Sequence, residues 1–289
     1  MSDPFQIERR AMRAAFDRAS ATYDEAAVLQ ARVREELADR LGLIDLAPAA
    51  VLDLGAGTGG GSRALARRYP EALVVAVDLA PAMLRRAAEA VPAVCADALR
   101  LPFGPESVDL VFSSLMLQWC DEPHAVFAEV RRVLRPGGFF AFSTFGPDTL
   151  REMRAAWSAA DGFTHVNRFI DMHDVGDALV RGGFTEPVMD VERICVTYQD
   201  VFALMRDLKA IGAHNVTAGR ARGLTGRARI ARMTAAYEQW RRDGRLPATY
   251  EVIYGAAWRA EDRDAAPVVA GEARIPLRMI RRRRNGEDA

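Results

Sequence analysis

Several features are scarce in this chain, and each absence excludes a class of protein. Only three cysteines occur, Cys95, Cys120 and Cys195, and they form no C-x-x-C pair, so neither a disulfide framework nor a zinc site is expected. No run approaches the roughly 20 apolar residues of a membrane span, and the charged N-terminus lacks the apolar segment of a signal peptide. We therefore expect a cytoplasmic protein with no membrane contact and no metal.

The chain also carries no net charge. The 39 basic and 39 acidic residues give a formal charge of +0, which does not favour a nucleic-acid-binding protein. Lys209 is the only lysine, which we attribute to genomic composition. What the chain does have is 289 residues that are 50% hydrophobic, enough for one large domain or for a domain with a smaller subdomain.

Short apolar runs alternate with helical patterns in the first half of the chain. Strands are predicted at 50–54, 72–77, 93–95, 108–113 and 139–145, with helices at 62–69, 81–90 and 124–134 between them. This alternation is typical of βαβ units, and runs that are apolar on both faces indicate a buried parallel sheet. The fold class is therefore α/β, a doubly wound and mostly parallel sheet.

The flanking regions divide the chain further. Residues 1–45 are predicted as an N-terminal helical lid, helical from 7 to 41, and 46–146 as the cofactor-binding core. Residues 147–259 are predicted as substrate-side helices with closing strands, and 260–289, which include four consecutive arginines at 281–284, as a disordered tail. The predicted elements after 146 are helices at 150–160, 174–181, 201–211 and 228–241 and strands at 188–196 and 249–258.

The first strand leads directly into a glycine-rich turn, Gly55-Ala56-Gly57-Thr58-Gly59. Glycine allows the backbone to approach a ligand closely, and the helix that follows points its N–H groups at that ligand. On its own, such a turn serves NAD, FAD or close packing alike.

Three acids at successive strand ends narrow the choice. Asp53 precedes the glycines and would repel a pyrophosphate but suit a cationic ligand, Asp78 is placed to bind ribose hydroxyls, and Asp97 is placed to accept from an adenine amino group. Each acid alone could simply cap a turn or a helix. Together they predict an S-adenosylmethionine site at the carboxyl edge of the sheet.

This pattern resembles the class I methyltransferases over roughly residues 45–145. The resemblance implies a Rossmann-like sheet of seven strands with S-adenosyl-L-methionine as cofactor. It also implies that the cofactor is bound by residues at the four strand ends: Asp53, Gly55, Gly57, Asp78, Leu79, Asp97, Ala98, Ser113 and Gln118.

Segments outside this core resemble one family, the malonyl-acyl carrier protein O-methyltransferases of biotin synthesis. The segments that carry the resemblance are Phe16–Gln30, Gln118-Trp119, Asn167-Arg168-Phe169, Leu208–His214 and Pro247–Tyr250. The resemblance implies methylation of the free carboxylate of a malonyl thioester. A carboxylate is already ionised at pH 7, so alignment and desolvation should dominate catalysis.

Three residues are predicted to act on the substrate. Arg168 is expected to hold the carboxylate through a bidentate pair, and Tyr23 and His214 are expected to hydrogen-bond either the cofactor or the carboxylate. Each could instead be structural. The acidic carrier protein is expected to dock on a basic patch formed by Arg206, Lys209, Arg220 and Arg222.

Other functions stay open at this level. Assembly factors of respiratory complex I, related proteins thought to hydroxylate an arginine, share the Tyr-Asp, Gln-Trp and Pro-Ala-Thr-Tyr segments. A methyltransferase for another small carboxylic acid and a cofactor-binding scaffold without turnover are further alternatives. The sequence indicates neither the oligomeric state nor whether the thioester is on a carrier protein or coenzyme A.

Overall fold

The fold is described from a computed structural model, for residues 3–261. The strands are β1 (Ala50–Leu54), β2 (Leu73–Asp78), β3 (Ala93–Cys95), β4 (Val108–Ser114), β5 (Leu134–Phe145), β6 (Phe184–Tyr198) and β7 (Leu246–Arg259). The helices are α1 (Arg9–Ala19), α2 (Tyr23–Ala26), α3 (Val28–Arg40), α4 (Gly60–Arg68), α5 (Pro81–Ala87), α6 (Pro123–Val133), α7 (Arg151–Ser158), α8 (Met172–Arg181), α9 (Val201–Ala210) and α10 (Arg227–Glu238), with 3-10 turns η1 (Leu41–Leu43) and η2 (Leu117–Trp119).

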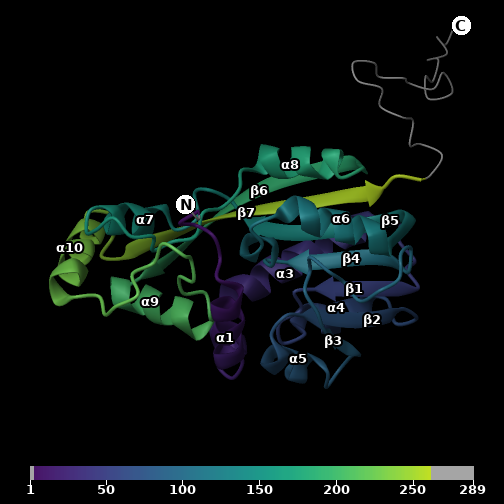
Figure 1. Ribbon diagram of the computed structural model, residues 1–289, viewed down its shortest axis with the longest axis horizontal. Helices are drawn as coiled ribbons and strands as arrows, with labels where there is room; N and C mark the ends of the chain where they lie inside the picture. The colour runs from purple at the N-terminus through teal and green to yellow at the C-terminus, as the bar shows by residue number, and fades with distance from the viewer. Residues whose placement is uncertain (1–2, 262–289) are drawn as a thin grey trace, which may run out of the picture.

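The strands form one seven-stranded sheet in the order β3-β2-β1-β4-β5-β7-β6 (Figure 1). β1 to β5 are parallel, and β7 is antiparallel to both of its neighbours. The predicted doubly wound, mostly parallel sheet is therefore confirmed. The strand order reverses between β1 and β4, which is the point where open α/β sheets bind ligands.

Helices cover both faces of the sheet. Because successive residues of a strand point to opposite faces, each central strand contributes side chains to two cores. Leu110 and Phe112 belong to a core with residues of α3, α4 and α5, whereas Val111, Phe140 and Phe142 belong to a core with residues of α6 and α8. This burial on two faces explains why the central strands are continuous apolar runs.

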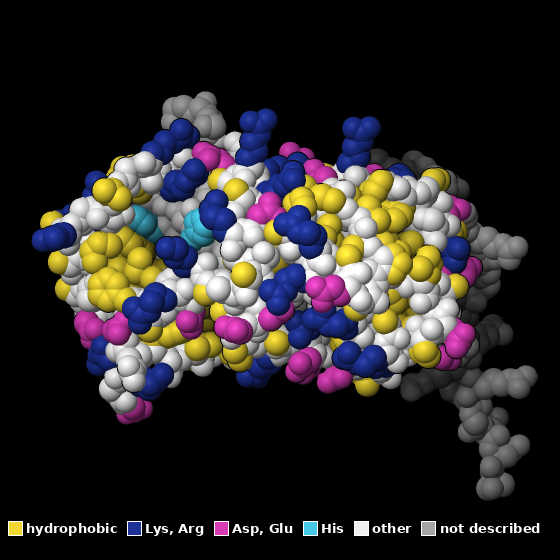
Figure 2. All heavy atoms as spheres, turned by 90° about the horizontal axis from the view of Figure 1, so that it is seen from below, with side chains coloured by type: hydrophobic (Ala, Val, Ile, Leu, Met, Phe, Trp, Pro, Cys, Tyr) yellow, Lys and Arg dark blue, Asp and Glu magenta, His cyan; other side chains and the backbone are white. Residues whose placement is uncertain are grey.

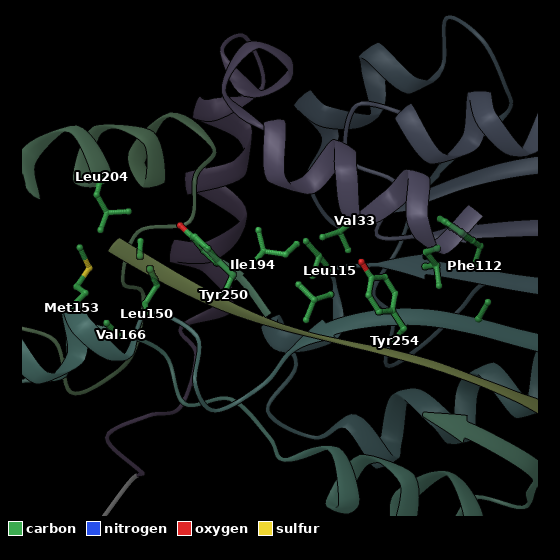
Figure 3. Packing of buried hydrophobic residues seen from close by; sticks show 14 of the residues in the cluster. Val33, Phe112, Leu115, Leu150, Met153, Val166, Ile194, Leu204, Tyr250 and Tyr254 are labelled. Carbon is green, nitrogen blue, oxygen red and sulfur yellow. The ribbon is translucent and has the colours of Figure 1, made fainter. Parts of the chain in front are cut away.

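The first core extends beyond the sheet of parallel strands. β6 and β7 are longer than the other strands, and their extended halves carry α7, α9 and α10 at one end of the molecule (Figure 1). There Met153, Leu204 and Tyr250 lie close together (Figure 3). The result is a lobe beyond the carboxyl edge of β1 and β4.

Several predicted boundaries were wrong: β6 begins at Phe184 and not at 188, β7 begins at Leu246 and not at 249, and α5 ends at Ala87 and not at 90. Two further differences have an identifiable cause. The helical stretch expected over 7–41 is divided into α1, α2 and α3, since the chain turns at residues 20–22 and again at Ala27. β5 begins at Leu134 and not at 139, because Leu134 pairs with Val108 and a register shift before Leu110 accommodates the intervening residues.

The predicted tail, 260–289, lies outside the described residues except for 260 and 261. Within residues 3–261, no helix is long and apolar enough to cross a membrane.

Gly255 tests the packing of the sheet. A Cβ at this position would lie 2.2 Å from Cζ of Phe142, a fully buried ring stacked on Phe140. Gly255→Ala should therefore lower the free energy of unfolding by about 1–3 kcal/mol, measured by urea denaturation, because overpacked cores must shift. Gly104→Ala, whose Cβ would meet nothing within 4 Å, serves as the control. Equal stability of the two variants would contradict the prediction.

Candidate functional site

The glycine-rich turn between β1 and α4 adopts a backbone that favours glycine. Gly55, Gly57 and Gly59 have φ values of +79°, +56° and +84°. The amides of Gly55 and Ala56 donate to the carbonyl of Val77 at 2.8 and 3.0 Å, which joins the ends of β1 and β2. A Cβ on Gly57 would meet nothing within 4 Å, so the turn presents bare backbone to the space above it.

That space is a cavity of about 290 Å³ at the carboxyl ends of β1 to β4. It is the first of two cavities at this edge of the sheet. Of the residues predicted from the sequence, those that line it are Tyr23, Gly55, Gly57, Asp78, Leu79, Asp97, Ala98 and Gln118.

Asp78 ends β2 with its carboxylate held by backbone amides. Gly57 N–H donates to Oδ2 at 2.9 Å, and Ala80 N–H donates to Oδ1 at 2.8 Å. Burial nevertheless raises the pKa of Asp78 above its ordinary value, and the amides oppose that rise. The carboxylate is thus fixed in position while it faces the cavity.

Asp97 has a partner that the sequence did not indicate. Its carboxylate forms an ion pair with Arg9 of α1 and accepts from the amide of Leu99 at 3.0 Å. The pair connects the N-terminal helix to the loop after β3.

Asp53 does not line the cavity, contrary to the prediction. Its side chain is 2% exposed and accepts from the hydroxyl of Ser62 at 2.6 Å. A Cβ on Gly61 would lie 2.8 Å from the carboxylate, so Asp53 packs directly beneath the start of α4. Its carboxylate therefore supports the turn and the start of α4.

Ser113 is also placed differently from the prediction. Its side chain is fully buried, and its hydroxyl donates to the carbonyl of Leu54 at 2.8 Å, so it ties β4 to β1 within the sheet. The neighbouring Ser114 lines the cavity in its place. A shift by one residue along a strand moves a side chain to the opposite face, which is why the prediction missed.

α1 and the residue Ile7 before it lie across the first cavity and are bonded to three segments around it. Ile7 N–H donates to Asp121 at 3.0 Å, Ala82 N–H donates to Asp17 at 2.8 Å, and Arg9 pairs with Asp97. Tyr23, at the start of α2, lines the same cavity, and burial raises the pKa of its hydroxyl to about 12. The Tyr23 hydroxyl is therefore protonated at neutral pH.

A second cavity of about 260 Å³ lies beside the first, under α7 and α9. Figure 2 shows a hollow on one face of the molecule with histidine side chains at its rim, and His165 and His214 line the second cavity. The residues that line both cavities are Gln30, Gln118, Trp119, Phe145, Ile211 and Ala213. The two cavities therefore share one wall.

The residues that were predicted to act on the substrate do not all lie in the same cavity. His214 lines the second cavity, and its buried Nδ1 has no hydrogen-bond partner within residues 3–261. Burial and the charges of Arg18, Lys209 and Arg220 lower the pKa of His214, so the ring is neutral at pH 7. Arg168 is exposed and lines neither cavity, contrary to the prediction.

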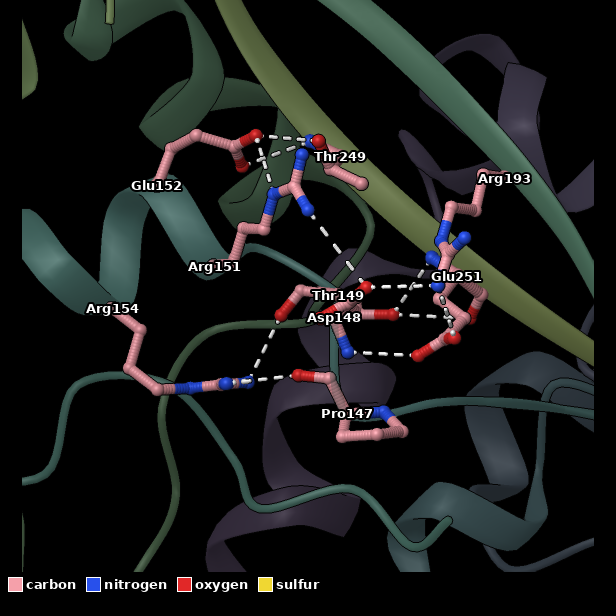
Figure 4. Close-up of polar contacts among 9 residues, drawn as sticks. All are labelled: Pro147, Asp148, Thr149, Arg151, Glu152, Arg154, Arg193, Thr249 and Glu251. Carbon is pink, nitrogen blue, oxygen red and sulfur yellow. Dashed lines mark hydrogen bonds and ion pairs between the residues drawn. The ribbon is translucent and has the colours of Figure 1, made fainter. Parts of the chain in front are cut away.

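Two buried glutamates hold the wall of the second cavity that follows β5 (Figure 4). Glu152 accepts from the amide of Thr249 at 3.1 Å, and Glu251 accepts from the amide of Asp148 at 2.8 Å. These bonds fix the segment that carries Thr149 and Leu150 into the cavity.

Comparison with known proteins agrees with this geometry. A family profile described as "Methyltransferase domain" matches residues 52–142. A malonyl-[acyl-carrier protein] O-methyltransferase of Laribacter hongkongensis is 58% identical, with 90% of this chain and 92% of that protein covered. Proteins of the same name from Methylovorus and Gallionella capsiferriformans are 51% and 48% identical, over 92% and 94% of this chain and 94% and 99% of theirs.

This chain belongs to the malonyl-[acyl-carrier protein] O-methyltransferase family. The match includes the N-terminal helices and the lobe of α7, α9 and α10 as well as the sheet, since a protein of the same name from Halorhodospira halophila, 47% identical, covers 98% of this chain and 98% of its own length. Family membership therefore favours the carboxyl methyltransferase over the assembly-factor alternative.

Solved structures support the fold of this O-methyltransferase family. The YcgJ protein from Bacillus subtilis has a TM-score of 0.57 at 16% identity, covering 78% of this chain and 99% of that one. The [4+2]-cyclase SpnF has a TM-score of 0.50 at 21% identity, covering 80% and 81%. Because a cyclase shares the fold, the fold alone does not define the reaction.

The O-methyltransferase site contains residues to which the sequence assigned no role, chiefly Gln30 and Asn167. Asn167 and Phe169 line the second cavity, whereas Arg168 between them points outward. Alternation in an extended segment was the signal available in the sequence: if Phe169 faces the cavity, its neighbour Arg168 faces away.

The raised pKa of Asp53 predicts that the stability of this protein depends on pH. Burial raises its pKa from 3.8 to about 6 in the folded state. The contribution of Asp53 to the free energy of unfolding is therefore complete below about pH 4 and is lost as the pH rises through 6. The loss is about 3 kcal/mol, because a shift of one pKa unit corresponds to roughly 1.4 kcal/mol. Urea denaturation of Asp53→Asn from pH 4 to 7.5 should show a correspondingly smaller decline than the unsubstituted protein.

The exposed Asp45 supplies the control for this experiment. Asp45→Asn should keep the original pH dependence. Identical pH profiles for Asp53→Asn and the unsubstituted protein would contradict the raised pKa.

Proposed function

We propose that this protein transfers a methyl group from S-adenosyl-L-methionine to the free carboxylate of malonyl-acyl carrier protein, giving the methyl ester that begins biotin synthesis. The observation that carries the proposal is the wall shared by the two cavities, because a donor in one and an acceptor in the other meet there. Relatives up to 58% identical carry the corresponding name. The unpaired Cys95, Cys120 and Cys195 suit a reducing cytoplasm.

The lining of the first cavity fits the cofactor. The open backbone at Gly57 leaves room for the methionine part, the fixed carboxylate of Asp78 suits ribose hydroxyls, and Asp97 with Leu99 and Ala98 lines the place for adenine. When bound, S-adenosylmethionine supplies an electrophilic methyl group on a sulfonium. Asp53 contributes by holding the start of α4 and the turn.

The protein's own part in the reaction is orientation and exclusion of water. The carboxylate nucleophile is ionised at pH 7 and needs no base. Trp119, Phe145 and Ile211 in the shared wall keep water from the reacting groups, which strengthens the attraction between the carboxylate and the positive donor. This arrangement replaces the predicted arginine clamp, since Arg168 lies outside.

Tyr23 and His214 have separate roles in this proposal. The protonated hydroxyl of Tyr23 is a hydrogen-bond donor toward the cofactor. The neutral ring of His214, with Nδ1 unpaired within residues 3–261, binds the thioester or the arm that carries it. Neither residue is needed as a base.

The carrier protein is proposed to dock beside the second cavity. Figure 2 shows Lys and Arg side chains around the hollow. Arg206 and Lys209 are exposed and form no ion pair within residues 3–261, whereas Arg220 and Arg222 both pair with Glu8. The first two therefore offer the freer charges for an acidic partner.

The reaction itself is the first test. Purified protein incubated with malonyl-acyl carrier protein and methyl-labelled S-adenosylmethionine should add one methyl group as a base-labile ester, detected by mass spectrometry. Asp78→Asn should raise the KM for the cofactor at least tenfold, because a lost charge-assisted hydrogen bond costs about 1.5–3 kcal/mol. Cofactor binding without ester formation would refute the proposed substrate.

Charge reversal tests the docking surface. The double variant Arg206→Glu with Lys209→Glu should lower kcat/KM for malonyl-acyl carrier protein roughly tenfold or more at low salt, with less effect at high salt. Turnover of malonyl-pantetheine, which lacks the carrier, should not change. Arg181→Glu with Arg85→Glu, on the distant α8 and α5, is the matched control. Equal losses with both substrates would place these residues in catalysis and refute docking.

A further inference from the structure

The wall shared by the two cavities contains two amide side chains among apolar ones. Trp119, Phe145, Ile211 and Ala213 supply the apolar part, and Gln30 and Gln118 supply the polar part. Any group of the acceptor that reacts with the donor must pass this wall. Its polar side chains are therefore the ones placed to hold the reacting carboxylate.

The side-chain amide of Gln118 already forms hydrogen bonds within the protein. Its Nε2 donates to the carbonyl of Leu115 at 2.5 Å, and its Oε1 accepts from the hydroxyl of Thr144 at 3.4 Å. These bonds fix the amide at the end of β4. Gln118 thus serves mainly as a rigid part of the wall.

Gln30, on α3, differs from Gln118 in this respect. It is partly buried, and its amide makes no hydrogen bond to any other residue in the range 3–261. A polar group that lines two cavities without a partner is available to a ligand, and leaving it unpaired in a filled site would cost free energy.

The distribution of charged residues around the cavities also favours a neutral amide as the group that binds the carboxylate. Among the lining residues of the second cavity there is no lysine or arginine. Arg9 and Arg13 line only the first cavity, and Arg9 is paired with Asp97. A cation at the shared wall would repel a sulfonium and would also draw electron density from the attacking carboxylate. A neutral amide orients a carboxylate without either effect.

We propose that Gln30 is the carboxylate-binding residue. Its Nε2–H donates to the oxygen that does not react, which leaves the other oxygen directed at the first cavity. That oxygen forms a bond to the methyl carbon as the carbon–sulfur bond breaks; the electron pair stays on sulfur, and no proton moves. Gln30 thereby selects malonyl over acyl thioesters without a terminal carboxylate. The inference rests on the proposed function.

The test compares Gln30→Leu and Gln30→Glu with the unsubstituted protein. kcat and KM are measured with malonyl-acyl carrier protein, and binding of malonyl- and acetyl-acyl carrier protein is measured in the presence of S-adenosylhomocysteine. Gln30→Leu should lower kcat/KM about tenfold or more and abolish the preference for malonyl over acetyl. Gln30→Glu should lose more, because two carboxylates repel.

Gln239→Leu is the matched control, since Gln239 is exposed and lines neither cavity. Its malonyl preference should equal that of the unsubstituted protein. S-adenosylhomocysteine should bind all four proteins with affinities within about twofold, which also shows that the variants are folded.

Two results would overturn the inference. One is a Gln30→Leu variant that keeps its preference for malonyl over acetyl. The other is a variant that loses S-adenosylhomocysteine and the carrier to the same extent, because the defect would not then be specific to the carboxylate. Failure of the proposed function is distinguishable, since the unsubstituted protein would form no ester.

Discussion

The two hydrogen bonds from the glycine turn to the carbonyl of Val77 are the constraint on which the site depends. They join the ends of β1 and β2, so the backbone of Gly57 and the carboxylate of Asp78 come to lie together, linked by a further bond of 2.9 Å. Asp53 supports the same turn from below through Ser62. The cofactor cavity is thus formed by backbone geometry first and by side chains second.

The second cavity depends on segments far apart in the chain. α3 contributes Gln30, the loop after β5 contributes Thr149 and Leu150, and the end of α9 leads into Ile211 and His214. The N-terminal segment is joined to this last region as well, because Glu8 N–H donates to the carbonyl of Val216 at 2.9 Å and its carboxylate pairs with Arg220. Residues 4–19 and 211–220 are therefore joined into one surface layer, and this layer borders both cavities.

The reaction chemistry explains why so few charged groups are needed. The acceptor carries its negative charge at neutral pH, and the donor carries a positive one, so the protein need only bring them together and exclude water. A neutral, largely apolar wall with amides suits this task better than an arginine clamp. The outward position of Arg168 is consistent with that chemistry.

The sequence by itself determined the sheet, the glycine turn and the placing of Asp78 and Asp97, because strand period and strand ends are local properties of the chain. It also pointed to the family through segments spread over the whole length. Only the tertiary structure decided that Asp53 and Ser113 face away from the cavity, that Arg9 pairs with Asp97, and that Gln30 lies at the shared wall. Those facts depend on which elements pack against each other, and contacts between distant segments leave no periodic signal in one sequence.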